Sequence, residues 1–132
     1  WERSQPYVDT LRSAFRHLAA GQVPQGYAMR GPATGDVLPA CVLPGGVVAD
    51  FSKGQVMTGS SLELLVGVVR NTGSSAVELD EAGCADGGTA AVAFWPEVLL
   101  QPGDKTEVFV ARRRARAGSS LSTRPSLIGR DG

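Results

Sequence analysis

The sequence predicts a mainly β domain, an immunoglobulin-like antiparallel β-sandwich preceded by one N-terminal amphipathic helix. Three observations predict this fold class. The 132 residues include 17 glycines and 8 prolines, a load typical of short strands joined by turns. Apolar runs recur at roughly 8–12 residues with turn residues between them, as in sandwiches and barrels. One segment, 4–20, instead repeats its apolar residues with a helical period.

The helical segment has an apolar stripe and both end signals. Ser4 is a candidate N-cap, Pro6 lies where a missing N–H costs nothing, and Gly21 can supply the left-handed C-cap. The stripe, which must be covered by the sandwich or by a neighbouring subunit, consists of Val8, Leu11, Phe15 and Leu18. We therefore expect residues 1–26 to form an amphipathic helix and a linker.

The β-sandwich is expected over residues 27–112. Short extended pieces are possible at Gly26–Arg30 and Val37–Leu43, within a stretch that is rich in glycine and proline. Regular strand signals follow at Val47–Phe51, Gln55–Thr58, Leu62–Asn71, Ala76–Asp80, Ala90–Trp95 and Thr106–Arg112. The run from Leu62 becomes continuously apolar, which indicates a central strand that is covered on both faces. The turn Gln101-Pro102-Gly103-Asp104 resembles the connection between the last two strands of immunoglobulin-like domains.

Residues 113–132 are predicted to form a flexible basic and apolar tail. Six arginines follow Ala111, against Asp131 as the single acid. Such a run can contact an acidic partner, anionic lipid or nucleic acid, or it can be a solvated exit from the last strand. The candidate partner-binding residues are Arg112, Arg113, Arg114, Arg116, Leu121, Leu127 and Ile128.

Two cysteines, Cys41 and Cys84, allow only one pairing. In a cytosolic protein both would be free, small, buried side chains. In an extracytoplasmic protein they are disulfide candidates, and closing this long loop would stabilise the fold by roughly 3–4 kcal/mol in the chain-entropy model.

Catalytic and metal-binding patterns are sparse. His17 is the only histidine, and a Cys–His dyad would require it to meet Cys41 or Cys84 across the fold. Asp80, Glu81 and Asp86 could hold calcium, but their spacing differs from that of a 12-residue calcium loop. We expect no enzymatic activity, no cofactor and no metal. Thirteen basic residues balance thirteen acidic ones, so overall charge does not indicate direct binding of nucleic acid.

The order of motifs resembles the C-terminal half of TraK-type proteins of F-like conjugation systems and integrating conjugative elements. The motifs are Gly-Gln-Val-Pro-Gln-Gly-Tyr, Val-Val-Arg-Asn-Thr-Gly, Leu-Asp-Glu-Ala-Gly-Cys, Ala-Val-Ala-Phe-Trp-Pro and Leu-Gln-Pro-Gly-Asp-Lys-Thr-Glu-Val-Phe-Val. The resemblance spans about residues 7–112 and implies a β-sandwich with a structural role. It implies a periplasmic, outer-membrane-associated subunit of a type IV secretion core complex that moves DNA between bacteria.

The partners implied by the resemblance are a TraV-like lipoprotein, a TraB-like protein and copies of the chain itself in a ring. The chain starts at Trp1 without a methionine, so we expect it to be a piece of a longer protein that has lost an N-terminal domain. The alternative function is a stand-alone periplasmic binding module, either a chaperone or a carbohydrate-binding sandwich. Most of the aromatic residues that a sugar site would need lie in apolar runs typical of a core.

Overall fold

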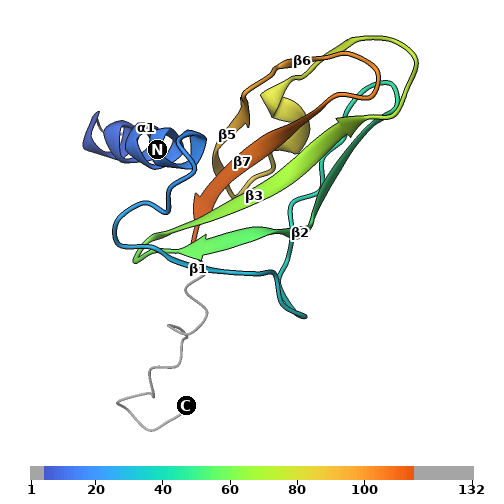
Figure 1. The fold of residues 1–132 in the computed structure, drawn as a ribbon. Coiled ribbons are helices and arrows are strands. Elements are labelled where there is room, and N and C mark those ends of the chain that lie inside the picture. Colours follow the sequence, from blue (N-terminus) through green and yellow to red (C-terminus); the bar gives the residue numbers. More distant parts are fainter. Residues whose placement is uncertain (1–4, 115–132) are drawn as a thin grey trace, which may run out of the picture.

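Five strands form the central sheet of this computed structural model, which describes residues 5–114 (Figure 1). Neighbouring strands are antiparallel in the order β1-β2-β3-β7-β5, and a small second sheet pairs β4 with β6. The elements in chain order are α1 (Gln5–Ala19), β1 (Ala28–Arg30), β2 (Val47–Thr58), β3 (Leu62–Asn71), β4 (Val77–Glu78), the 3-10 helix η1 (Glu81–Cys84), β5 (Thr89–Trp95), β6 (Leu99–Leu100) and β7 (Lys105–Arg113). The prediction of a mainly β, antiparallel fold with one N-terminal helix is confirmed.

Helix α1 ends as its sequence predicts. Gly21 has a φ of 75°, which glycine adopts without strain. The Gly21 N–H donates to the carbonyl of Leu18, and the Gln22 N–H donates to that of His17. These two hydrogen bonds form a Schellman motif. The N-cap proposed at Ser4 lies outside the described residues.

One face of the sheet is covered by α1. Leu11, Ala14 and Leu18 are buried against it, and the ring of Phe15 lies 5.9 Å from that of Phe109. On the sheet side the buried members of this cluster are Met57, Leu62, Leu64, Val66, Ala90, Phe109 and Ala111. The helical stripe is therefore covered within the domain, although Ala14 is more buried than Phe15 and Val8.

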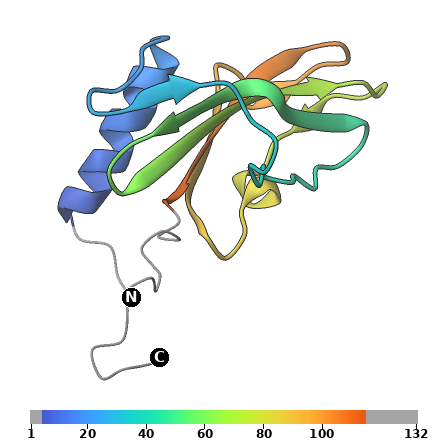
Figure 2. The ribbon, with the colours of Figure 1, turned by 90° about the horizontal axis from the view of Figure 1, so that it is seen from below.

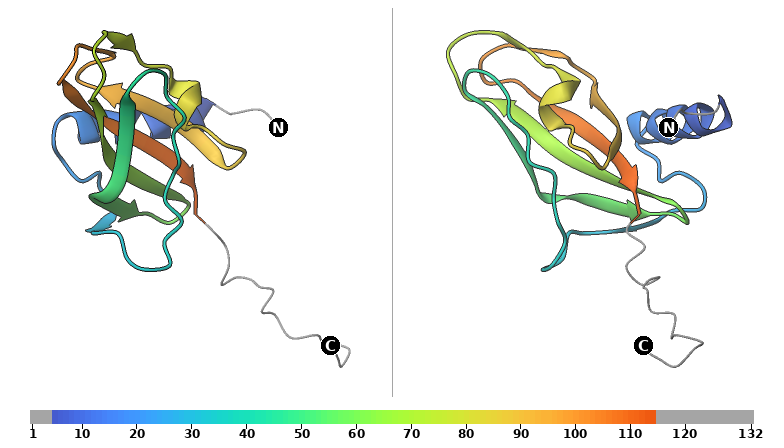
Figure 3. Two further views of the ribbon diagram at one scale, coloured as in Figure 1. Left: turned by 90° about the vertical axis from the view of Figure 1, so that its right-hand side faces the viewer. Right: turned by 180° about the vertical axis from the view of Figure 1, so that it is seen from behind.

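The opposite face of the sheet packs against the segment before β2, η1 and the small sheet. In the left panel of Figure 3 that segment crosses in front of the sheet while α1 lies behind it. The buried residues of this second core are Val47, Phe51, Val56, Leu65, Val69, Leu79, Cys84, Phe94, Leu100, Val108 and Val110. The domain therefore has three layers, with α1 and η1 on opposite sides of the sheet (Figure 2). Strand β3 is central and buried on both faces over most of its length, as its apolar run predicts.

The prediction of two strands at Val47–Phe51 and Gln55–Thr58 is wrong, because both belong to β2. The pairing of β2 with β3 shifts register between Asp50 and Gln55, which is a bulge inside one long strand. A Cβ atom on Gly54 would overlap the carbonyl oxygen of Val66. Gly54 thus allows β2 to come close to the backbone of β3, and Lys53-Gly54 is not a turn between strands.

Asn71 joins three parts of the fold at the end of β3. Its buried amide nitrogen donates to the carbonyls of Ser75 (2.8 Å) and Leu100 (3.0 Å), and its side-chain oxygen accepts from the Gly73 N–H (2.9 Å). Its backbone N–H donates to Asp104, and its carbonyl accepts from Gly103. One polar side chain therefore fixes the approach of the small sheet to β3 and β7.

Candidate functional site

A disulfide joins Cys41 to Cys84, with the Sγ atoms 2.07 Å apart and the Cα atoms 4.1 Å apart. It connects the segment before β2 to η1 at the edge of the second core. The Val42 N–H also donates to the carbonyl of Gly83 at 2.7 Å, and a Cβ on Gly83 would lie 2.6 Å from the carbonyl oxygen of Val42. The cysteine pair therefore holds the segment before β2 against η1, which is a structural role.

The basic run begins inside the sheet. Arg112 Nε and Nη2 both lie 2.8 Å from Glu63 Oε1 on the neighbouring strand β3. Strand β7 continues through Arg113, and Arg114 donates to the carbonyls of Ser61 and Gly59 in the β2–β3 turn. The predicted start of the tail at residue 113 is therefore corrected, because Arg113 and Arg114 are bound to the sheet. The other candidates, Arg116, Leu121, Leu127 and Ile128, lie outside the described residues.

A second ion pair lies near the β1 edge. The Arg30 guanidinium donates to both carboxylate oxygens of Asp36, at 2.7 and 3.0 Å, and the Ala33 N–H donates to the same carboxylate at 2.7 Å. Hydrogen bonding from Arg30, assisted by Ala33, lowers the pKa of Asp36 to about 2. The bidentate contact raises the pKa of Arg30.

Replacing Arg30 by Ala is expected to raise the pKa of Asp36 toward its ordinary value. A lowered carboxyl pKa favours folding above the unfolded-state value of about 3.9, and that contribution is lost as the pH falls through about 2. NMR titration of the side-chain carboxyl carbon measures the shift, and Arg12→Ala on α1 is the control that leaves it unchanged. An Asp36 titration that is the same with and without Arg30 contradicts the assignment.

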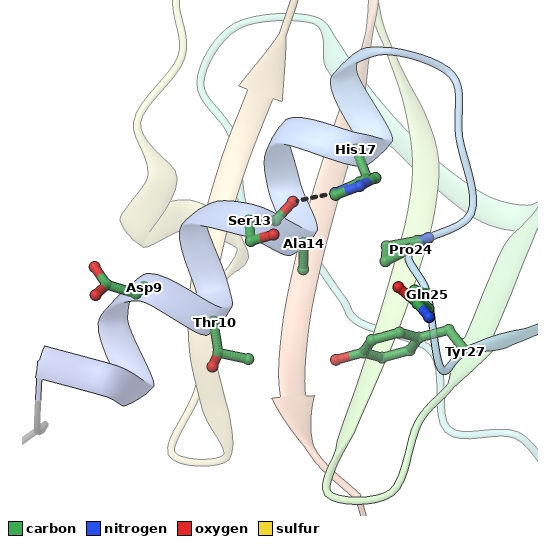
Figure 4. Close-up of a pocket in the computed structure, with 8 residues that line it drawn as sticks. All are labelled: Asp9, Thr10, Ser13, Ala14, His17, Pro24, Gln25 and Tyr27. Atoms are coloured by element: carbon green, nitrogen blue, oxygen red, sulfur yellow. Dashed lines mark hydrogen bonds between the residues drawn. The ribbon is translucent and has the colours of Figure 1, made fainter.

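A cleft of about 370 Å³ lies between α1 and the segment before β1 (Figure 4). The Tyr27 hydroxyl points toward the helix in this view, and burial raises the pKa of Tyr27. The lining residues are Asp9, Thr10, Ser13, Ala14, His17, Pro24, Gln25 and Tyr27. His17 Nδ1 lies 2.7 Å from the carbonyl oxygen of Ser13, so this nitrogen bonds to the helix's own backbone.

A nucleophilic Cys–His dyad is not formed by the described residues. Both sulfur atoms are in the disulfide, and a disulfide sulfur is not the thiolate such a mechanism requires. Among residues 5–114 no group of three or more acidic, histidine or cysteine side chains is placed to hold a metal ion. Asp80 instead caps η1 through the Ala82 N–H, and Asp86 accepts from Gly88 and Thr89 in its own loop.

A second hollow, which we call the acidic groove, opens on the side of η1 and the small sheet. Its volume is about 580 Å³, and its lining residues are Glu78, Leu79, Asp80, Glu81, Phe94 and Val98. Of its apolar lining residues, Phe94 and Leu79 are buried, whereas Val98 is 50% exposed. The groove therefore combines three carboxylates with one well-exposed apolar side chain, Val98.

The face of the sheet that carries α1 is covered only in part. Val68 pairs with Glu107, and Glu107 pairs with Trp95, so these side chains share the helix-side face. Val68 is 40% exposed and Trp95 48% exposed. Trp95 thus departs from the prediction that most aromatic residues belong to the core, whereas Phe51, Phe94 and Phe109 are buried as expected.

The acidic groove, the Tyr27 cleft and the Arg30–Asp36 pair were not predicted from the sequence. Each depends on strand register or loop approach, which single-sequence periodicity does not give. The run of carboxylates from Glu78 to Asp86 is the one signal that points to the groove. Within residues 5–114, no helix has the length and apolar character needed to cross a membrane.

A family model described as the TraK C-terminal domain matches residues 1–112. That range contains every described element except the last residue of β7. The chain is also 31% identical over 129 residues to a protein of Pseudomonas syringae pv. syringae named type 3 secretion system secretin. This similarity covers 93% of the chain but only 18% of that relative's length.

Proposed function

This chain belongs to the TraK C-terminal domain family, and we propose on that premise that it is a structural subunit of a bacterial envelope secretion complex. In the finer form of the proposal, the complex is the outer-membrane core of a conjugative type IV secretion system. The domain acts there by protein–protein assembly in the periplasm. Its partners are a TraV-like lipoprotein, a TraB-like protein and further copies of itself, and it does not contact DNA directly.

The observation that carries the proposal is the family match across nearly the whole described domain. The surface supports an assembly role. Several large apolar side chains are exposed, among them Val48, Val68 and Trp95 on the helix-side face, and Val98 and Leu99 beside the acidic groove. Exposed apolar groups bordered by charge are typical of interaction surfaces. The disulfide favours an oxidising compartment such as the periplasm.

A second candidate function is a domain of a larger secretin of a protein-secretion system. The similarity to the type 3 secretion system secretin favours it, because that similarity extends over 129 residues and so beyond the family match. Both candidates place the domain in an envelope assembly. They differ in what the assembly moves.

Deleting residues 5–114 in frame from the encoded protein tests the two candidates in cells. The first predicts that DNA transfer to recipient cells falls to background while the remaining protein is still detected in the envelope fraction. The second predicts that secretion of protein is lost and DNA transfer is unchanged. Arg16→Ala, an exposed position on α1, is the control that preserves function. Unchanged DNA transfer and unchanged protein secretion together contradict both candidates.

A further inference from the structure

Acidic and basic residues are equal in number in this chain, but they are concentrated in different stretches of it. Residues 71–104 contain six carboxylates and no lysine, arginine or histidine. From residue 112 onward there are six arginines and one aspartate, and three of these arginines (Arg116, Arg124 and Arg130) lie in residues 115–132. The acidic stretch contains β4, η1, β5 and β6, and therefore every residue that lines the acidic groove.

The acidic groove also has an apolar component. Its accessible apolar side chain is Val98, and the next residue, Leu99, is also about half exposed, whereas the lining residues Phe94 and Leu79 are buried. The segment 115–132 carries matching groups, since Leu121, Leu127 and Ile128 alternate with its arginines. An arginine-bearing segment with apolar residues therefore complements the groove both in charge and in apolar contact.

The groove and the end of β7 lie at different ends of the domain. Phe94 pairs with Val108, and the strand then runs about 17 Å further to Arg113, at about 3.4 Å per residue. In Figure 1, β6 lies at the upper end of the sheet and β7 ends at the lower end. The described end of β7 therefore lies at the opposite end of the domain from the groove of the same copy.

We propose that the acidic groove of one copy binds residues 115–132 of a second copy. The contact is head-to-tail, joining one end of a domain to the opposite end of the next, which is the interface type that builds rings. The inference rests on the proposed assembly role and names the surface and the segment through which copies of the chain associate. The arginines steer the encounter, and apolar burial in the groove holds the segment.

Sedimentation of the full 132-residue chain over a range of concentrations tests this contact. We expect association that strengthens with concentration and weakens at high salt, because exposed charge pairs are screened. The double variant Glu78→Lys/Glu81→Lys is expected to weaken association by a factor of roughly ten or more. Neither side chain is a capping residue, and circular dichroism checks that the variant folds.

The control is Glu107→Lys, which makes one such Glu→Lys change, two charge units against the four of the double variant, on an exposed strand residue of the opposite face. It is expected to associate as the unaltered chain does. The reciprocal change Arg116→Glu/Arg124→Glu is expected to weaken association, and combining both pairs of reversals restores it.

Three results overturn the proposal. A chain that stays monomeric at every concentration at low salt has no such contact. A loss of association in Glu107→Lys in proportion to its smaller charge change means that the effect is one of net charge. A change in the monomer's hydrodynamic radius on groove reversal, without any association, shows that the chain's own segment occupies the groove. These measurements use the purified chain alone. Self-association of the chain, together with unchanged DNA transfer and protein secretion after deletion of residues 5–114, therefore contradicts the proposed function and not this contact.

Discussion

The variant Phe109→Ala is expected to lower the free energy of unfolding by about 3–5 kcal/mol, the usual cost of removing a fully buried phenylalanine. Phe109 is 1% exposed and lies in β7 beneath α1, with its ring 5.9 Å from that of Phe15. Its removal opens a cavity between helix and sheet, where both layers are fixed by other contacts. Urea denaturation followed by circular dichroism measures the loss.

Two companion variants make this result specific. Phe109→Leu keeps most of the apolar volume and is expected to cost clearly less. Phe15→Ala is also expected to cost less, because Phe15 is only partly buried. A loss below about 1 kcal/mol for Phe109→Ala is inconsistent with a ring enclosed between α1 and the sheet.

Replacing both cysteines, Cys41→Ala/Cys84→Ala, is expected to destabilise the domain by roughly 3–4 kcal/mol. The bond closes a loop with a sequence separation of 43 and restricts the unfolded chain accordingly. It also fixes η1 and the segment before β2 over the second core. The comparison is between the oxidised chain and the double variant under the same denaturant titration.

Thiol alkylation of the unfolded, unreduced protein tests independently whether Cys41 and Cys84 are bonded. Protein purified from the periplasm is expected to show no free thiol, and reduction is expected to reveal two. Two free thiols before reduction would falsify the oxidised state, and with it the disulfide's contribution to stability.

The fold class was predictable because the signals that determine it are local. The stripe of α1 and the glycine after it identify a helix and its end, and the apolar run of β3 identifies a central strand. The bulge in β2 was not predictable, because Gly54 resembles a turn residue until β3 is placed beside it. Strand β6 was missed since its two residues, Leu99 and Leu100, follow no period of their own.

The candidate sites were predicted less completely than the fold. Because two cysteines allow only one pairing, Cys41 and Cys84 were disulfide candidates from the sequence, on the condition that the protein is extracytoplasmic. The basic run was noticed for its charge, yet the pairing of Arg112 with Glu63 depends on the β3–β7 register. The acidic groove requires β4, η1 and β5 to come together. The periodicity of apolar residues does not indicate such a tertiary arrangement.

The most direct test of the assembly role is the native mass of the encoded protein in the envelope. Detergent-solubilised envelopes, separated by sedimentation and probed for this domain, are predicted to show it in one large complex with many copies of itself. After Glu78→Lys/Glu81→Lys, the amount in that complex is predicted to fall while the total amount of protein is unchanged. A protein that sediments as a monomer, outside any envelope complex, contradicts the account.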